Sequence, residues 1–242
     1  MTAMRRKLLL IILLATTLSA WGKDKLYDKV DRPNHRPVNF GVKTGFNSSM
    51  FIVSELKIQD VTINEVQNNY KIGYFGAFFM RINMKKHFIQ PEVSYNVSKC
   101  DISFDKLGAQ HPDIEPDYAS VTSVLHSIDF PVLYGYNVVK QGPYGMSIFG
   151  GPKFRYLWGR KNEITFKNFD QEGIRENIHP LNASIVVGVG VNISRIFFDF
   201  RYEQDLFNIS KSVTYNSTTT GVSDITFRRR DSALSFSLGV IF

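Results

Sequence analysis

The last eleven residues of the chain, 232–242, alternate strictly between large apolar side chains and small ones. The large side chains are those of Leu234, Phe236, Leu238, Val240 and Phe242, and the small ones are those of Ala233, Ser235, Ser237 and Gly239. Successive side chains of a β-strand point to opposite faces. The segment therefore predicts a strand with one face in lipid and one in a tight interior, and its length suits a tilted transmembrane strand of about 9–11 residues.

Seven earlier segments show the same period of two, with Phe, Tyr, Val and Ile on one face and Gly, Ser and charged residues on the other. The first begins at Val38, and the others cover 70–83, 87–100, 121–138, 145–158, 180–193 and 195–208. Helices are disfavoured because apolar residues recur at i and i+2 and glycine interrupts most segments. Pro91 cannot donate to a strand ladder, so it predicts a local bulge in its segment.

The connections between these eight segments alternate in length. Long polar stretches are expected at 54–69, 101–120, 159–179 and 210–231, and short turns near 83–86, 139–144 and 194. Outer-membrane barrels have short periplasmic turns and longer extracellular loops. The sequence thus predicts an all-β fold, namely an eight-stranded antiparallel up-and-down transmembrane β-barrel with four long extracellular loops and short periplasmic turns. Pairing of 232–242 with the strand that begins at Val38 would close it and leave no open edge in lipid.

Average hydropathy agrees with a barrel. The mean hydropathy of −0.13 excludes a polytopic helical membrane protein, whereas a barrel keeps an ordinary average because only every second strand residue faces lipid. Aromatic residues near strand ends are expected to form girdles, with Tyr134 and Tyr136 at the periplasmic rim and Tyr156 and Trp158 at the outer rim.

The N-terminus has the features of a secretory signal peptide. Arg5, Arg6 and Lys7 precede an apolar run from Leu8 to Leu14, and small residues follow up to Gly22. We therefore expect a cell outer membrane protein, exported through a cleaved signal peptide. Its expected parts are a signal peptide at 1–22, a periplasmic lead-in at 23–37 and an outer-membrane β-barrel domain at 38–242.

Charge and cysteine content exclude several classes of function. The formal net charge is +7, and removal of the three cations of the signal peptide leaves +4. That surplus is too small for a nucleic-acid-binding footprint. Cys100 is the only cysteine, so neither an internal disulfide nor a cysteine metal site is expected. No cofactor or metal is predicted.

Charged residues also lie on the inward phase of the predicted strands. They are five cations, Lys43, Arg81, Lys153, Arg155 and Arg201, and four acids, Glu92, Asp129, Asp199 and Glu203. An eight-stranded barrel is just wide enough for side chains to fill it, so charges buried there must pair. We interpret the nine residues as a lumen charge network that plugs the barrel. A charged pore or a small-ligand site is the alternative.

Three further features have a functional and a structural interpretation. A lipid-modifying enzyme would need a nucleophile beside a histidine near the membrane edge, and His126 with Ser123 or Ser127 is the candidate, although no catalytic residue is predicted. The run 228–230 consists of arginines that either contact anionic lipid headgroups and lipopolysaccharide phosphates or lie on a solvated loop. Phe242 resembles the C-terminal aromatic signal that outer-membrane assembly machinery reads.

Four segments carry a resemblance to a known family. They read L-H-S-I-D-F-P-V-L-Y-G-Y at 125–136, S-I-F-G-G-P-K-F-R-Y-L at 147–157, I-V-V-G-V-G-V at 185–191 and F-F-D-F-R-Y-E at 197–203. They resemble the PorT-like outer-membrane β-barrel family of Bacteroidetes, and the resemblance covers 38–242. It implies an eight-stranded porin-like barrel in the outer membrane, and the namesake of the family takes part in type IX protein secretion.

The expected function is that of a non-enzymatic outer-membrane barrel, acting as a structural, assembly or type IX secretion-associated component. A small pore or a ligand-binding barrel is the alternative, and a lipid-modifying enzyme is the third interpretation. The expected partners are outer-membrane lipids and lipopolysaccharide, the barrel-assembly machinery and other cell-envelope proteins, with no nucleic acid.

Overall fold

The computed structural model describes residues 37–58, 61–63, 66–106, 115, 117–159, 162–169, 174–214 and 225–242. The expected signal peptide at 1–22, and the lead-in up to residue 36, lie outside the described residues. The described part of the chain contains no helix that is long and apolar enough to cross a membrane.

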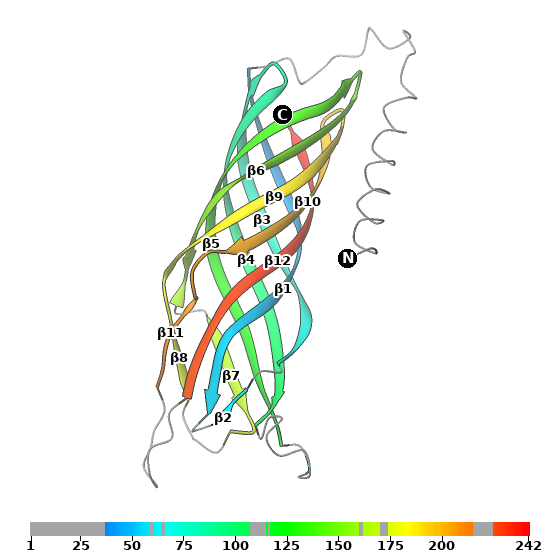
Figure 1. The fold of residues 1–242 in the computed structure, drawn as a ribbon. Coiled ribbons are helices and arrows are strands. Elements are labelled where there is room, and N and C mark those ends of the chain that lie inside the picture. Colours follow the sequence, from blue (N-terminus) through cyan, green and yellow to red (C-terminus); the bar gives the residue numbers. More distant parts are fainter. Residues whose placement is uncertain are drawn as a thin grey trace.

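The described residues form a ring of eight long antiparallel strands (Figure 1). The ring strands are β1 (Val38–Ile58), β3 (Gln67–Met84), β4 (His87–Asp105), β5 (Tyr118–Gln141), β6 (Tyr144–Leu157), β9 (Leu181–Ile193), β10 (Ile196–Asp205) and β12 (Ile225–Ile241). Four short strands complete the fold, β2 (Val61–Thr62), β7 (Glu163–Lys167), β8 (Arg175–Ile178) and β11 (Ser210–Thr214). The prediction of an eight-stranded antiparallel barrel is confirmed.

The first and last strands close the ring. β1 pairs with β12 from Gly41 opposite Ile241 up to Ile58 opposite Ile225. The backbone N–H of Phe242 donates to the carbonyl oxygen of Phe40 at 2.8 Å and extends this ladder by one bond. The predicted closure is therefore confirmed, and the chain terminates inside the last ladder.

The two ends of the barrel differ. At one end, tight turns join β3 to β4, β5 to β6 and β9 to β10, and Lys85, Gly142 and Ser194 take positive φ values of 55°, 56° and 57° there. The C-terminus lies at this end, which we call the turn end (Figure 1). The opposite end carries β2, β7, β8 and β11, and we call it the loop end. Short turns in outer-membrane barrels lie in the periplasm, so the loop end corresponds to the end predicted to be extracellular.

Polarity inverts along the strands between the two ends. Near the turn end the outward residues of β4, such as Ile89 and Val93, are apolar and the inward Gln90 and Glu92 are polar. Beyond Ser98 the order reverses, so that the buried inward residues are apolar. The buried apolar side chains of this loop-end core are Leu56, Ile63, Cys100, Ile102, Phe104, Ala119, Val121, Leu125, Leu157, Ile209 and Phe227. The loop-end part of the barrel thus has the polarity of a water-soluble barrel.

Two predictions about the strands were wrong. The stretches expected as long polar loops contain the ends of β1, β3, β4, β5 and β12 and the whole of the four short strands, because their alternate apolar residues pack into the loop-end core. Pro91 forms no bulge. The ladder from β3 to β4 skips Pro91 and resumes in the same register, and on the other side Pro91 pairs with Val132. The shifts in register lie elsewhere, at Val53/Glu55 in β1, Tyr70/Tyr74 in β3 and Asn137/Val139 in β5.

Candidate functional site

The lumen receives all nine charged residues that the sequence assigned to it. Eight of them are buried and Glu203 is half-buried, and they come from six different strands of the ring. The strands supply Lys43 from β1, Arg81 from β3, Glu92 from β4, Asp129 from β5 with Lys153 and Arg155 from the adjoining β6, and Asp199, Arg201 and Glu203 from β10. Eight of the nine form ion pairs, and they fall into two groups along the barrel axis.

The first group, Lys43, Glu92, Asp199 and Arg201, lies nearer the turn end and is called the turn-end cluster. Lys43 Nζ lies 3.0 Å from Glu92 Oε2 and 3.1 Å from Asp199 Oδ2. Arg201 donates to both Glu92 oxygens at 2.9 and 2.8 Å, and to Asp199 at 2.7 Å. Each cation therefore bridges both acids, and Ser237 Oγ donates to the remaining Asp199 oxygen at 2.7 Å.

On the turn-end side of this cluster, a layer of aromatic side chains fills the lumen. Phe79, Phe88 and Phe197 are almost fully buried, and the rings of Phe79 and Phe197 pack edge to face at 5.1 Å. Arg81 forms no ion pair that the structure shows among the described residues. Its guanidinium lies 4.5 Å from the centre of the Phe88 ring, and its Nε donates to Gln90 at 2.5 Å. Arg81 is thus held by cation–π contacts and one amide.

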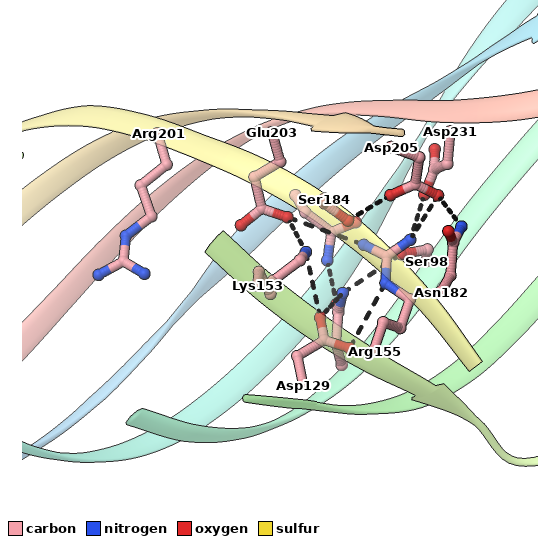
Figure 2. Close-up of polar contacts among 12 residues, drawn as sticks. Ser98, Asp129, Lys153, Arg155, Asn182, Ser184, Arg201, Glu203, Asp205 and Asp231 are labelled. Carbon is pink, nitrogen blue, oxygen red and sulfur yellow. Dashed lines mark hydrogen bonds and ion pairs between the residues drawn. The ribbon is translucent and has the colours of Figure 1, made fainter. Parts of the chain in front are cut away.

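The second group lies toward the loop end and is called the loop-end cluster (Figure 2). Its members are Asp129, Lys153, Arg155, Glu203, Asp205 and Asp231. Arg155 is the central cation. Its Nη1 donates to Asp231 at 3.0 Å and approaches Asp205 at 3.5 Å, and its Nε lies 3.4 Å from Asp129. Lys153 lies 3.3 Å from Asp129 and also pairs with Glu203. Asn182 and Ser184 donate to Asp205 at 2.7 and 2.5 Å.

The sequence analysis missed two acids of this cluster. Asp205 has the same inward phase of β10 as Asp199 and Glu203, so strand phase alone was enough to identify it. Asp231 was assigned to a loop. It lies in β12 on the inward phase that Ser235 and Ser237 follow, so continuing the alternation of the closing segment backwards would have found it.

A cavity of about 20 Å³ separates the two clusters. Its lining includes Glu92 and Arg201 from the turn-end cluster, Lys153 and Glu203 from the loop-end cluster, and Asn96 between them. A single water molecule needs roughly 10–15 Å³ of such space. The cavity is therefore of water size, and it is far smaller than the clefts of several hundred Å³ that take small organic ligands.

A buried clamp connects the lumen to the loop-end core. Arg229 donates through Nε and Nη2 to the two oxygens of Glu176 at 3.1 and 2.9 Å, and through Nη1 to Ser123 Oγ at 2.9 Å. Both side chains of the ion pair are fully buried. Because Glu176 lies in β8, the clamp fixes the β6–β9 connection against β12. The prediction that Arg229 contacts lipid or solvent is wrong, since alternation turns it inward.

The candidate enzymatic pair is not assembled. Ser123 and Ser127 point into the barrel and are buried, whereas His126 has the opposite phase of β5 and lies on the outer surface. There its Nδ1 is 2.8 Å from the hydroxyl oxygen of Tyr95. Strand alternation explains the outcome, because a residue at an odd spacing from another cannot share its face.

The geometry as a whole is that of a filled barrel. An aromatic layer, two ion-pair clusters, a buried clamp and an apolar core follow one another from the turn end to the loop end. Among the described residues, no group of three or more His, Cys, Asp or Glu side chains is arranged to hold a metal ion. The site is suited to holding strands together across the lumen.

The fold resembles several solved outer-membrane proteins. The outer membrane protein OprG from Pseudomonas aeruginosa matches with a TM-score of 0.54 and 10% identity, covering 88% of this chain and 99% of that chain. Neisserial surface protein A matches with a TM-score of 0.37 and 12% identity over 83% and 96% of the two chains. Ail, the attachment invasion locus protein of Yersinia pestis, gives 0.36 and 9% over 86% and 100%.

At these identities the likeness to solved structures concerns the fold alone. No curated protein matches the sequence. The narrower resemblance to the PorT-like family of Bacteroidetes stays a prediction. The family model described as "Outer membrane protein beta-barrel domain" matches residues 27–211, which is most of the chain, and the chain belongs to this family.

Proposed function

We propose that this chain is a sealed, non-enzymatic barrel of the outer membrane, which acts through its surfaces as a structural or assembly component. The observation that supports this most strongly is the filled lumen. Ion pairs join strands that are not neighbours in the ring, and the described residues leave a cavity of about 20 Å³ between the two clusters.

An open pore would require these layers to separate. An ion passing the turn-end cluster would have to break the contacts of Arg201 to Glu92 at 2.8 and 2.9 Å, and then those of Arg155 to Asp231 at 3.0 Å. Breaking a buried pair costs about 3–5 kcal/mol when one partner is removed. On the loop-end side of the clusters, the lumen is filled by packed apolar side chains and by the buried ion pair of Arg229 with Glu176. A closed lumen therefore agrees better with these contacts than the small pore or ligand-binding barrel does.

The working surface of a sealed barrel is its loop end together with its lipid face. The loop end is extended by β2, β7, β8 and β11, which gives it a folded rather than a loose surface. We propose other cell-envelope proteins as its partners, outer-membrane lipids and lipopolysaccharide as the partners of the lipid face, and the barrel-assembly machinery as a transient partner during insertion. An association with type IX secretion is the narrower form of this proposal, and it rests on the resemblance of the four sequence segments.

Conductance tests the sealed lumen. Purified full-length protein in planar bilayers should give no current steps above those of protein-free bilayers, while a heat-dependent shift in gel mobility from the same sample shows that the barrel is folded. Discrete open-channel steps that disappear after heat denaturation would contradict a sealed lumen and support the small pore.

A deletion strain tests the cellular role. If the protein belongs to a secretion machine, its loss should reduce delivery of type IX cargo to the surface while entry of a hydrophobic dye stays unchanged. If it is a general envelope component, dye entry should rise. Normal cargo delivery together with normal dye entry would contradict both forms of the proposal.

A further inference from the structure

The side chains of three consecutive arginines in β12 point to alternate sides of the barrel wall. Arg229 is buried in its clamp with Glu176, whereas Arg228 and Arg230 are exposed on the outer face. Successive strand residues point to opposite sides, so the two outer guanidinium groups lie on one face and two residues apart. The sequence run is therefore two separate features, an inner clamp and an outer pair of cations.

On β12 the outer pair lies just beyond the large apolar residues of the same face, and the exposed Ile52 of β1 lies opposite Arg230. Leu234 is the last large apolar side chain on that face of β12 and is 48% exposed. Ser232 follows and donates to the hydroxyl of Tyr202 at 3.1 Å. A strand rises about 3.3 Å per residue, so Arg230 lies about 13 Å along β12 from Leu234, which at a tilt near 45° is about 9 Å in height. This height places the pair where the apolar face of β12 gives way to charge, which is the level expected for lipid headgroups on the loop-end side.

Further cations flank the pair on both sides. In β1, Ile52 lies opposite Arg230 and the exposed Lys57 lies opposite Thr226. On the other side β11 lies beside β12, with the N–H of Ile209 bonded to the carbonyl of Arg229 at 2.9 Å, and its Lys211 is exposed.

Two residues of neighbouring elements lie next to the pair. Glu55 is the acid opposite Arg228 in the ladder, and Asn208 accepts from Arg230 Nε at 3.3 Å. Among the described residues of β1, β11 and β12 near the pair, Arg228, Arg230, Lys57 and Lys211 are exposed cations, and this part of the outer face is rich in positive charge.

We propose that Arg228 and Arg230, flanked by Lys57 and Lys211, form a binding site for phosphate groups of lipids in the outer leaflet. Arginine suits this ligand, because its planar guanidinium donates two parallel hydrogen bonds to a phosphate. The position argues for a lipid rather than a soluble anion, because the exposed apolar side chains from Leu234 onward on the same face of β12 offer a surface for its acyl chains. The inference rests on the part of the proposed function that gives the lipid face lipopolysaccharide as a partner, but it does not depend on whether the lumen is sealed.

The test measures lipid retention by the full-length protein in nanodiscs. Barrels are loaded with radiolabelled lipopolysaccharide in phosphatidylcholine, exchanged against excess phosphatidylcholine vesicles, and analysed for retained label. Each juxtamembrane cation contributes about a fivefold gain in affinity for an anionic surface. The double variant Arg228→Gln, Arg230→Gln should therefore retain the lipid about 25-fold less tightly.

A matched control separates the site from net charge. The variant Lys85→Gln, Lys86→Gln removes the same two charges from the exposed turn between β3 and β4 at the other end of the barrel. It should retain lipopolysaccharide as the unchanged protein does, and both variants should keep the heat-dependent gel shift of a folded barrel. Equal retention by the arginine variant and the lysine variant would overturn the proposal.

Two further arms identify the source of the phosphate. One arm uses lipopolysaccharide from which the phosphates have been removed. The unchanged protein should retain this lipid as weakly as the arginine variant retains intact lipopolysaccharide. Inorganic phosphate at millimolar concentration should not displace the lipid. Displacement by inorganic phosphate would show a general anion site and would overturn the assignment to lipid.

Discussion

Arg201 and Glu92 are 109 residues apart in the chain and meet in the lumen as a two-point ion pair, with Nη1–Oε2 and Nη2–Oε1 distances of 2.9 and 2.8 Å. They come from β10 and β4, which are not neighbours in the ring. The pair therefore fixes opposite walls of the barrel, which the ladders between adjacent strands cannot do.

Removing this cation should destabilise the barrel strongly. Arg201→Met leaves Glu92 and Asp199 with Lys43 as their remaining cation in the cluster, and loss of one partner of a buried pair costs about 3–5 kcal/mol. The free energy of unfolding by urea in lipid vesicles measures the loss. Lys71→Met is the control, because Lys71 pairs with Asp101 at 3.5 Å with its side chain 48% exposed, and such a pair contributes at most about 1 kcal/mol. Equal losses for the two variants would contradict a stabilising role of the cluster.

Gly135 should tolerate no side chain. A Cβ there would lie 2.0 Å from Cζ of Phe88, whose ring is fixed against Arg81. Gly135→Ala should lower the free energy of unfolding by about 1–3 kcal/mol, as overpacking of a filled interior does. Gly76→Ala is the control, since nothing lies within 4 Å of its added Cβ. The combination of Gly135→Ala with Phe88→Leu should recover part of the loss, and no recovery would show that the aromatic layer is not the cause.

Breaking the buried clamp should release the β6–β9 connection. Glu176→Gln leaves the charge of Arg229 without its buried counter-charge, so β8 should detach more often from β12. We expect faster proteolysis between 159 and 180 in reconstituted barrels, with the heat-dependent gel shift retained because the ring ladders are intact. Glu163→Gln, at an exposed position of β7, is the control. Unchanged proteolysis in the Glu176 variant would show that the clamp does not hold this segment.

The inversion of polarity explains what the sequence could and could not predict. Alternation with apolar residues outward identified each strand where lipid covers it, and the phase of Lys43, Glu92 and Arg201 followed directly. In the loop-end half, Ile102 and Phe104 point inward and Ser103 points to water, so the same alternation has the opposite sense. A strand that is identified only by its apolar outer face is therefore predicted to end too early. For this reason the loop-end parts of the strands were predicted to be loops.

The contacts within the lumen could not be predicted from the sequence, for a different reason. Phase assigns a side chain to the interior but gives neither its height along a tilted strand nor its partner. The pairing of Arg155 with Asp231, 76 residues apart, and of Arg229 with Glu176 depends on the stagger of the whole ring and on short strands at the loop end. The division of the charges into two clusters could be found only once these strands had positions.

The C-terminal aromatic residue gives a prediction about assembly. Phe242 is 57% exposed on the outer face, and its backbone N–H is bonded to Phe40 at 2.8 Å, so its ring makes a small contribution to the folded interior. If the ring is an assembly signal, Phe242→Ala should slow insertion by purified barrel-assembly machinery in proteoliposomes, while spontaneous insertion into detergent micelles should proceed at the same rate. Val240→Ala, two residues earlier on the same face, is the control and should not affect the assisted reaction. Equal slowing of assisted and spontaneous insertion by Phe242→Ala would show that the ring stabilises the last strand and is not read by the machinery.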